Sequence, residues 1–270
     1  MKLGVCTNMI SSPDDIFGTS QYNAISEAGF DYIELSMATV MSADEKCFRN
    51  FMKKLSDSPI KCEIACSLMQ PGIRVVDDEY NENKLIEYIE AVAKRASEIG
   101  IKTIVFGSPL SRSMTQPPYS LANTLLKLEI SLHIIMDYMD AHGITVVMEP
   151  LNRLETNVIN TFSESADFCR RVGRKSLRSM IDFAHFKINY EPYDSIIANS
   201  ALLAHIHISR PFQRKFPTDE REEDYSGFIK TLSEAGYDGT ISIEAVSGDV
   251  KKDAKTSYKM LRELISRYYR

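Results

Sequence analysis

Four ionisable residues stand at the ends of short apolar runs in the second half of the chain. Glu149 and Asp182 each follow such a run, and His207 and Glu244 do the same further on. A charged side chain is costly to bury unless it has a partner. A single divalent cation would be a partner for all four at once. These residues therefore predict a metal site, provided that the chain brings the four runs side by side.

The types of the four residues indicate which metal they would hold. Three carboxylates and one imidazole make an oxygen-rich set with a single nitrogen ligand. Such a set suits Mn²⁺ best, with Mg²⁺, Co²⁺ and Zn²⁺ as alternatives. Each residue alone is more often a cap, a salt-bridge partner or a structural histidine. The coincidence of four on consecutive runs favours the metal site.

Eight apolar runs alternate with longer amphipathic segments along the chain. The runs are 2–8, 32–37, 61–68, 103–108, 145–150, 179–185, 203–209 and 240–246. Runs that are apolar throughout predict strands buried on both faces, as in a parallel sheet covered by helices. Eight such βα units fill residues 1–270 and predict one α/β domain, a single (β/α)8 TIM barrel. The alternative, an open doubly wound sheet, would carry a glycine-rich turn after its first strand, and residues 6–15 contain none.

The active site of such a barrel lies at the carboxyl ends of the strands, where the four residues fall. His205 and His207 are two positions apart on one strand and therefore point to the same face. His207 is nearer the carboxyl end and is expected to reach the metal, whereas His205 is expected to be structural. His133 and His142 lie on or after a predicted helix and are expected to be solvated.

Composition limits the partners and the compartment. The chain has 270 residues and a formal net charge of -5, which argues against a nucleic-acid partner. No window reaches the run of about 18 apolar residues that a membrane span requires. The five cysteines are odd in number and scattered, which predicts free thiols in a reducing compartment. We therefore expect a cytoplasmic protein without a membrane segment.

Four segments of the chain resemble a known family. They read MEPLNRLET, MIDFAHFKI, HIHISRPFQRKFP and YDGTISIEA, in this order. The sequence is similar to the xylose isomerase-like TIM barrel superfamily of sugar phosphate isomerases and epimerases. Within it, the sequence most resembles the sugar epimerases related to D-tagatose 3-epimerase, the ketose 3-epimerases. The resemblance covers essentially the whole chain, is strongest from Thr145 to Val246, and implies the same four metal ligands.

The resemblance also implies which residues contact the sugar. They are Glu155, His185 and an arginine that follows the seventh strand. In the epimerases this arginine stands at a fixed distance from the seventh strand, and the same distance in this sequence leads to Gln213. The next residue, Arg214, is taken as the counterpart, with Arg210 as the alternative.

The sequence gives less support to two other functions, a nuclease with three metal ions and the binding of a phosphate group. The endonuclease branch of the superfamily has additional metal-binding histidines after the third and fourth strands. This chain has Ser67 and Gly107 there, so a three-metal nuclease site is not expected. The basic residues Arg210, Arg214 and Lys215 could bind a phosphate, or could belong to a solvated loop that is balanced by an acidic stretch just downstream.

These residues together predict a metal-dependent epimerase or isomerase that acts on a ketose or a sugar phosphate. Glu149 and Glu244 are the expected catalytic residues: one takes a proton from the carbon beside a carbonyl and the other returns one, through an enediolate. Bases on opposite faces give epimerisation, whereas one base that moves a proton between neighbouring carbons gives isomerisation. The alternatives are a metal-dependent dehydratase of the inosose or dehydroshikimate type and a non-catalytic sugar-binding barrel. A homo-oligomer is compatible with the resemblance, because barrels of this family often pair.

Overall fold

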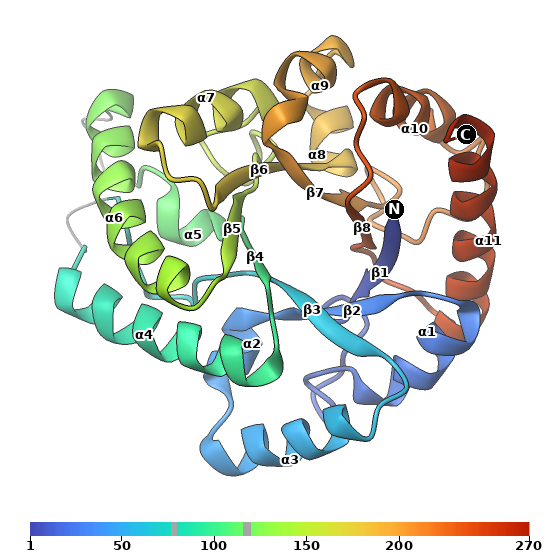
Figure 1. Ribbon diagram of the computed structural model, residues 1–270, viewed down its shortest axis with the longest axis horizontal. Helices are drawn as coiled ribbons and strands as arrows, with labels where there is room; N and C mark the ends of the chain where they lie inside the picture. Colours follow the sequence, from blue (N-terminus) through green and yellow to red (C-terminus); the bar gives the residue numbers. More distant parts are fainter. Residues whose placement is uncertain (77–79, 116–119, 270) are drawn as a thin grey trace.

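The computed structural model describes residues 1–76, 80–115 and 120–269. Eight parallel strands form a closed barrel in sequence order (Figure 1). The strands are β1 (Lys2–Cys6), β2 (Tyr32–Ser36), β3 (Lys61–Cys66), β4 (Thr103–Phe106), β5 (Thr145–Met148), β6 (Leu177–Asp182), β7 (Leu203–Ile208) and β8 (Thr240–Ile243). The predicted TIM barrel is confirmed. The alternative of an open sheet is wrong, because the first strand pairs with the last.

Helices surround the barrel and cover the outer face of its strands (Figure 1). They are α1 (Tyr22–Ala28), α2 (Met37–Ser42), α3 (Glu45–Ser56), α4 (Glu82–Ile99), α5 (Pro109–Arg112), α6 (Leu121–Ala141), α7 (Phe162–Val172), α8 (Phe183–Ile188), α9 (Asp194–Asn199), α10 (Tyr225–Glu234) and α11 (Val250–Tyr268), with 3-10 turns η1 (Thr19–Gln21) and η2 (Ser200–Leu202). On α4 the buried residues Leu85, Ile89, Val92 and Ala96 recur at helical spacing, so that one stripe of the helix is apolar. Within the described ranges, no helix is both long and apolar enough to cross a membrane.

The ends of α4 illustrate how local sequence sets the boundary of an element. The side-chain oxygen of Asn81 accepts a hydrogen bond from the backbone N–H of Lys84 at 3.0 Å. This bond satisfies one of the N–H groups that the first turn of a helix leaves unpaired. The helix ends at Gly100, whose φ of 94° is a left-handed conformation that a residue without a side chain adopts easily. The chain can therefore turn sharply and enter β4.

The apolar core has an outer and an inner part. The outer part lies between the strands and the surrounding helices and contains most of the buried side chains. The inner part is a separate cluster inside the barrel, formed by Cys66, Val105, Val147 and Met180 from four consecutive strands. The strands are thus buried on both faces, as their apolar sequences predict.

The end of the sixth strand differs from the prediction. The apolar run 179–185 was expected to be all strand, but β6 ends at Asp182 and the short helix α8 begins at the next residue. An Asp182 carboxylate oxygen accepts hydrogen bonds from the backbone N–H groups of Ala184, at 2.7 Å, and of His185, at 3.3 Å. Aspartate therefore acts as the N-cap of α8. This turn places His185 one helical turn from Asp182, on the same side of the helix.

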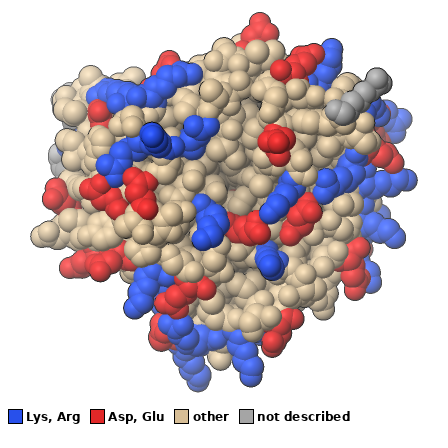
Figure 2. All heavy atoms as spheres, viewed as in Figure 1, with Lys and Arg blue, Asp and Glu red and all other residues tan. Residues whose placement is uncertain are grey.

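The surface mixes charges of both signs. Figure 2 shows Lys and Arg side chains interspersed with Asp and Glu over the visible face of the described residues. A protein that binds nucleic acid usually gathers basic side chains on one face. The mixture on this face is typical of an ordinary protein surface, and the predicted lack of a nucleic-acid partner stays a prediction.

Candidate active site

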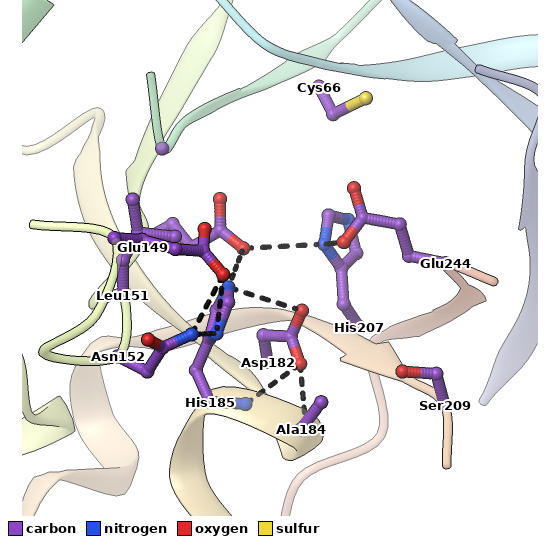
Figure 3. A network of polar contacts seen from close by, with 12 residues as sticks. Cys66, Glu149, Leu151, Asn152, Asp182, Ala184, His185, His207, Ser209 and Glu244 are labelled. Atoms are coloured by element: carbon purple, nitrogen blue, oxygen red, sulfur yellow. Dashed lines mark hydrogen bonds and ion pairs between the residues drawn. The ribbon is translucent and has the colours of Figure 1, made fainter. Parts of the chain in front are cut away.

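The four residues predicted as metal ligands converge at the carboxyl ends of their strands. Glu149 directly follows β5, Asp182 ends β6, His207 lies in β7 and Glu244 directly follows β8. One ligand atom from each residue can be chosen so that all four lie within 4.8 Å of one another. Figure 3 shows Glu149 and Glu244 on opposite sides of a common space, with Asp182 between them in the view. The structure therefore brings together the whole predicted set.

His207 is held in the orientation that a metal ligand needs. Its Nε2 lies 2.9 Å from Oε1 of Glu34, which comes from β2 on the other side of the barrel. An ionised carboxylate can only accept, so Nε2 carries the proton that this bond requires. The other ring nitrogen, Nδ1, is buried and has no hydrogen-bond partner among the described residues. It lies 3.4 Å from Glu244 Oε2 and 3.6 Å from Glu149 Oε1.

The electrostatics around His207 favour positive charge. Burial acts to raise the pKa of Glu34, but the neighbouring His207 and His205 hold it well below its ordinary value, so the carboxylate is ionised. Burial acts to lower the pKa of His207, but Glu34 and Glu244 raise it well above its ordinary value. Positive charge is therefore stabilised here, as a proton on His207 or as a cation beside it. A nitrogen without a partner and three carboxylates fit a divalent cation.

His205 lies one layer deeper, as predicted. Its Nδ1 is 2.7 Å from the hydroxyl of Thr240 and its Nε2 is 3.1 Å from Glu34 Oε2. Glu34 is completely buried and therefore bridges the two histidines inside the barrel. His205 is satisfied by these partners, which suits a structural role. His133 and His142 are exposed on and after α6, as expected.

Arg214 bridges two of the carboxylates. Its guanidinium donates to Asp182 Oδ2 and to Glu244 Oε2, both at 2.6 Å. Burial acts to raise the pKa of Asp182, but the Arg214 charge pulls it far below its ordinary value. The backbone carbonyl of Arg214 accepts a hydrogen bond from the backbone N–H of Val246, just after β8. This bond fixes the loop that carries Arg214 to the site. The alternative, Arg210, is paired instead with Glu222 at 3.4 Å, so Arg214 is the arginine that reaches the site.

Arg112 and Gly107 pack against Glu149. Its backbone carbonyl accepts a hydrogen bond from the guanidinium of Arg112 at 2.6 Å, and the same guanidinium donates to Gly107 O at 2.7 Å. A side chain at position 107 would collide with the Glu149 carboxylate, so Gly107 makes room for it. Burial, reinforced by the charge of Glu244, raises the pKa of Glu149 above its ordinary value.

The predicted sugar-binding residues Glu155 and His185 share one neighbour. The side-chain amide of Asn152 lies 2.8 Å from Glu155 Oε1 and 2.8 Å from His185 Nδ1. His185 is buried, whereas the Glu155 side chain is 46% exposed. Figure 3 shows His185 beside Asn152, with Asp182 and Glu149 around its other edge. His185 therefore borders the space between the four ligands on the β6 side, and Glu155 lies beside the opposite ring nitrogen.

Three residues of the site were not predicted: Glu34, Arg112 and Asn152. Glu34 offered a signal, because it is the single charged residue within the apolar run 32–37. Arg112 ends the short helix α5, and Asn152 lies in the loop after β5 within the segment MEPLNRLET, but no pattern singled out either residue. Each has partners nearby in the sequence, but the contact that ties it to the site comes from a distant segment: Arg112 donates to Glu149 O, 37 positions away, and Asn152 contacts His185, 33 positions away.

Comparisons with known proteins identify the family. A sequence profile of the xylose isomerase-like TIM barrel family matches residues 22–264, and the chain belongs to that family. The chain is 24% identical over 231 residues to a ketose 3-epimerase of Arthrobacter globiformis, which covers 83% of this chain and 76% of the relative. The prediction of an isomerase related to the ketose 3-epimerases is confirmed at the level of the enzyme class.

Solved structures share the fold. A D-psicose 3-epimerase with D-tagatose, from Clostridium cellulolyticum H10, superposes with a TM-score of 0.83 at 16% identity and covers 98% of this chain and 99% of its own. The IOLI protein with a bound zinc atom superposes with a TM-score of 0.76 at 16% identity, over 100% of this chain and 99% of its own.

Proposed function

We propose that this protein is a divalent-metal-dependent epimerase or isomerase that acts on an unphosphorylated ketose. The observation that carries the proposal is the pair of buried glutamates, Glu149 and Glu244, on opposite sides of one space. Carboxylates that face each other across a substrate can remove a proton from one face of a carbon and deliver one to the other face. The match to a ketose 3-epimerase supports the same chemistry.

The metal would be held by Glu149, Asp182, His207 and Glu244. When bound there, a divalent cation supplies Lewis-acid polarisation of a neighbouring carbonyl, which acidifies the adjacent C–H bond. The chain itself supplies the proton transfer. Glu149 and Glu244 each have two carboxylate oxygens, so an oxygen that faces the metal leaves a second oxygen for a proton.

Other residues would hold the sugar. His185 borders the space on the β6 side, the half-exposed Glu155 lies beside His185, and Arg214 borders the space on the β8 side. Such polar groups fix hydroxyl and carbonyl oxygens in place, so that the reacting carbon lies between the two bases.

The charges near the site favour an unphosphorylated substrate. Of the basic cluster that could bind a phosphate, Arg214 is paired with Asp182 and Glu244, and Arg210 is paired with Glu222. The charges of both guanidinium groups are thus already balanced by carboxylates, which weakens their attraction for a phosphate. Lys215, the third member, is exposed.

The proposal is tested by product analysis. Metal-loaded protein is incubated with a panel of ketohexoses, ketopentoses and their phosphates, and the products are separated by chromatography. We expect an epimer or an aldose from at least one free ketose, and loss of that product in Glu149→Gln and Glu244→Gln. An absorbance of a conjugated enone would indicate the dehydratase instead. A panel with no product, together with sugar binding, would point to a non-catalytic barrel.

We also infer that the protein works in a reducing compartment such as the cytoplasm. All five cysteines are free, and four of them are buried. Free thiols are usual where the cell keeps cysteines reduced. Pairing of barrels into a homo-oligomer stays a prediction.

A further inference from the structure

The side-chain amide of Asn152 has one orientation that its neighbours allow. Asn152 is 3% exposed, and the backbone N–H of Leu154 lies 2.9 Å from its Oδ1. An N–H can only donate, so the amide atom that faces it must be the oxygen. The other amide atom, Nδ2, lies 2.8 Å from Glu155 Oε1, which as a carboxylate oxygen can only accept. The amide is therefore fixed from both ends.

This orientation decides the tautomer of His185. Asn152 Nδ2 lies 2.8 Å from His185 Nδ1. Because Nδ2 donates, Nδ1 must accept and cannot carry a proton. The proton of the neutral ring is then on Nε2.

The protonated nitrogen of His185 faces the space between the metal ligands. Its Nε2 lies 4.0 Å from Glu149 Oε1 and 3.8 Å from Asp182 Oδ2, distances that are too long for hydrogen bonds. The Nε2–H group is therefore directed toward the two carboxylates without being consumed by either. It is placed to donate to an oxygen of a bound molecule.

We infer that Asn152 is a positioning residue that makes His185 a hydrogen-bond donor and holds Glu155 beside it. The catalytic meaning of this inference rests on the proposed function. A donor at Nε2 stabilises the oxyanion of an enediolate. A ring whose Nδ1 accepts from an amide has its lone pair occupied there and its proton on the substrate side, so His185 does not act as the base. Proton removal is left to Glu149 and Glu244.

The tautomer can be measured in the wild-type protein without substrate. Protein with ¹⁵N-labelled histidine has only five such residues, and the His185 signals are assigned as those missing from His185→Gln. At about pH 8, where an ordinary histidine is neutral, an unprotonated ring nitrogen resonates far downfield of a protonated one. We expect Nδ1 of His185 to be unprotonated and Nε2 protonated. A proton on Nδ1 would overturn the inference.

The substitution Asn152→Asp tests the cause. Aspartate keeps the size and the oxygen that accepts from Leu154, but its second oxygen can only accept from His185. We expect Nδ1 of His185 to become protonated, because only a donor can face the new carboxylate oxygen. The control is Asn157→Asp, which adds the same charge at an exposed position of the same loop and leaves the tautomer unchanged. An Nδ1 that stays unprotonated in Asn152→Asp would refute the inference, and if this variant does not fold, the wild-type spectrum still decides.

Kinetics separate this inference from the proposed function. Where the wild type converts a ketose, Asn152→Asp should lower kcat about 100-fold, the usual effect of losing one oxyanion donor, with a smaller change in KM. Asn157→Asp should keep wild-type kcat. Equal kinetics in both variants would show that the tautomer has no part in the reaction. An inactive wild type with the expected tautomer would reject the proposed function and leave the assignment of Asn152 standing.

Discussion

Glu34 offers a direct test of how the barrel interior prepares the metal site, through the substitution Glu34→Gln. The carboxylate accepts one hydrogen bond from His207 at 2.9 Å and one from His205 at 3.1 Å. Glutamine has the same shape but one oxygen and one NH₂ group, and it carries no charge. It can accept from one histidine only, and its NH₂ must face the other.

The expected magnitude follows from these two contacts. A hydrogen bond to a charged group contributes about 1.5–3 kcal/mol, and the substitution removes the charge from one bond and the acceptor from the other. Loss of a partner that orients a metal-binding histidine typically lowers metal affinity about 10–100-fold. We therefore expect the Kd for Mn²⁺ to rise by about one to two orders of magnitude in Glu34→Gln. His207 and the three carboxylates remain in place.

Titration calorimetry with Mn²⁺ measures the effect. The matched control is Glu63→Gln, which makes the same chemical change on β3, where Glu63 pairs with Lys2 at 2.8 Å and its side chain is 40% exposed. The control should bind Mn²⁺ like the wild type. An unchanged Kd in Glu34→Gln would refute the reasoning, because His207 would then bind the metal without its buried partner.

Three further predictions concern packing, pH and the arginine that bridges two of the predicted ligands. Gly107→Ala should weaken Mn²⁺ binding at least about tenfold, because the new methyl group displaces the Glu149 carboxylate, whereas Gly248→Ala, with open space around it, should bind normally. Calorimetry on both variants checks this, and equal affinities would count against it. Burial raises the pKa of Glu191 to about 7, so its contribution to stability is present below pH 4.5 and is lost as the pH rises toward 7. Glu191→Gln should therefore gain up to about 3 kcal/mol relative to wild type between pH 5 and pH 8 in denaturant unfolding, and a pH-independent difference would contradict the assignment. Arg214→Met leaves two buried carboxylates without their cation and should cost about 3 kcal/mol of stability in metal-free protein, less with saturating Mn²⁺. Equal losses with and without metal, measured by thermal unfolding, would disprove that role.

The barrel could be predicted because its signal is local and repeated. Seven of the eight predicted runs contain an observed strand in full, and the run 179–185 overlaps β6, which begins two residues earlier at Leu177. The run 179–185 was misjudged for a physical reason. Asp182 bonds to the backbone N–H groups of Ala184 and His185, which stabilises a helix in a sequence apolar enough for a strand.

The four ligands could be predicted because a barrel brings all its strand ends together. Once the fold was inferred, position along each strand was enough to place Glu149, Asp182, His207 and Glu244 in one site. The residues that orient these ligands could not be predicted from position along a strand. Glu34 contacts His207 across 173 positions of sequence, and no spacing rule connects two such residues.

Solvent deuterium tests the central claim most directly. Metal-loaded wild-type protein is incubated with its ketose in D₂O. The reaction is stopped while most of the ketose is still unconverted, and the product is analysed by NMR and mass spectrometry. Two glutamates on opposite faces predict that each new product molecule carries one deuterium at the carbon beside the carbonyl, because the returning proton comes from a base that has exchanged with solvent. Product that forms without deuterium at that carbon would contradict a mechanism in which one of Glu149 and Glu244 removes the proton and the other, exchanged with solvent, delivers a new one.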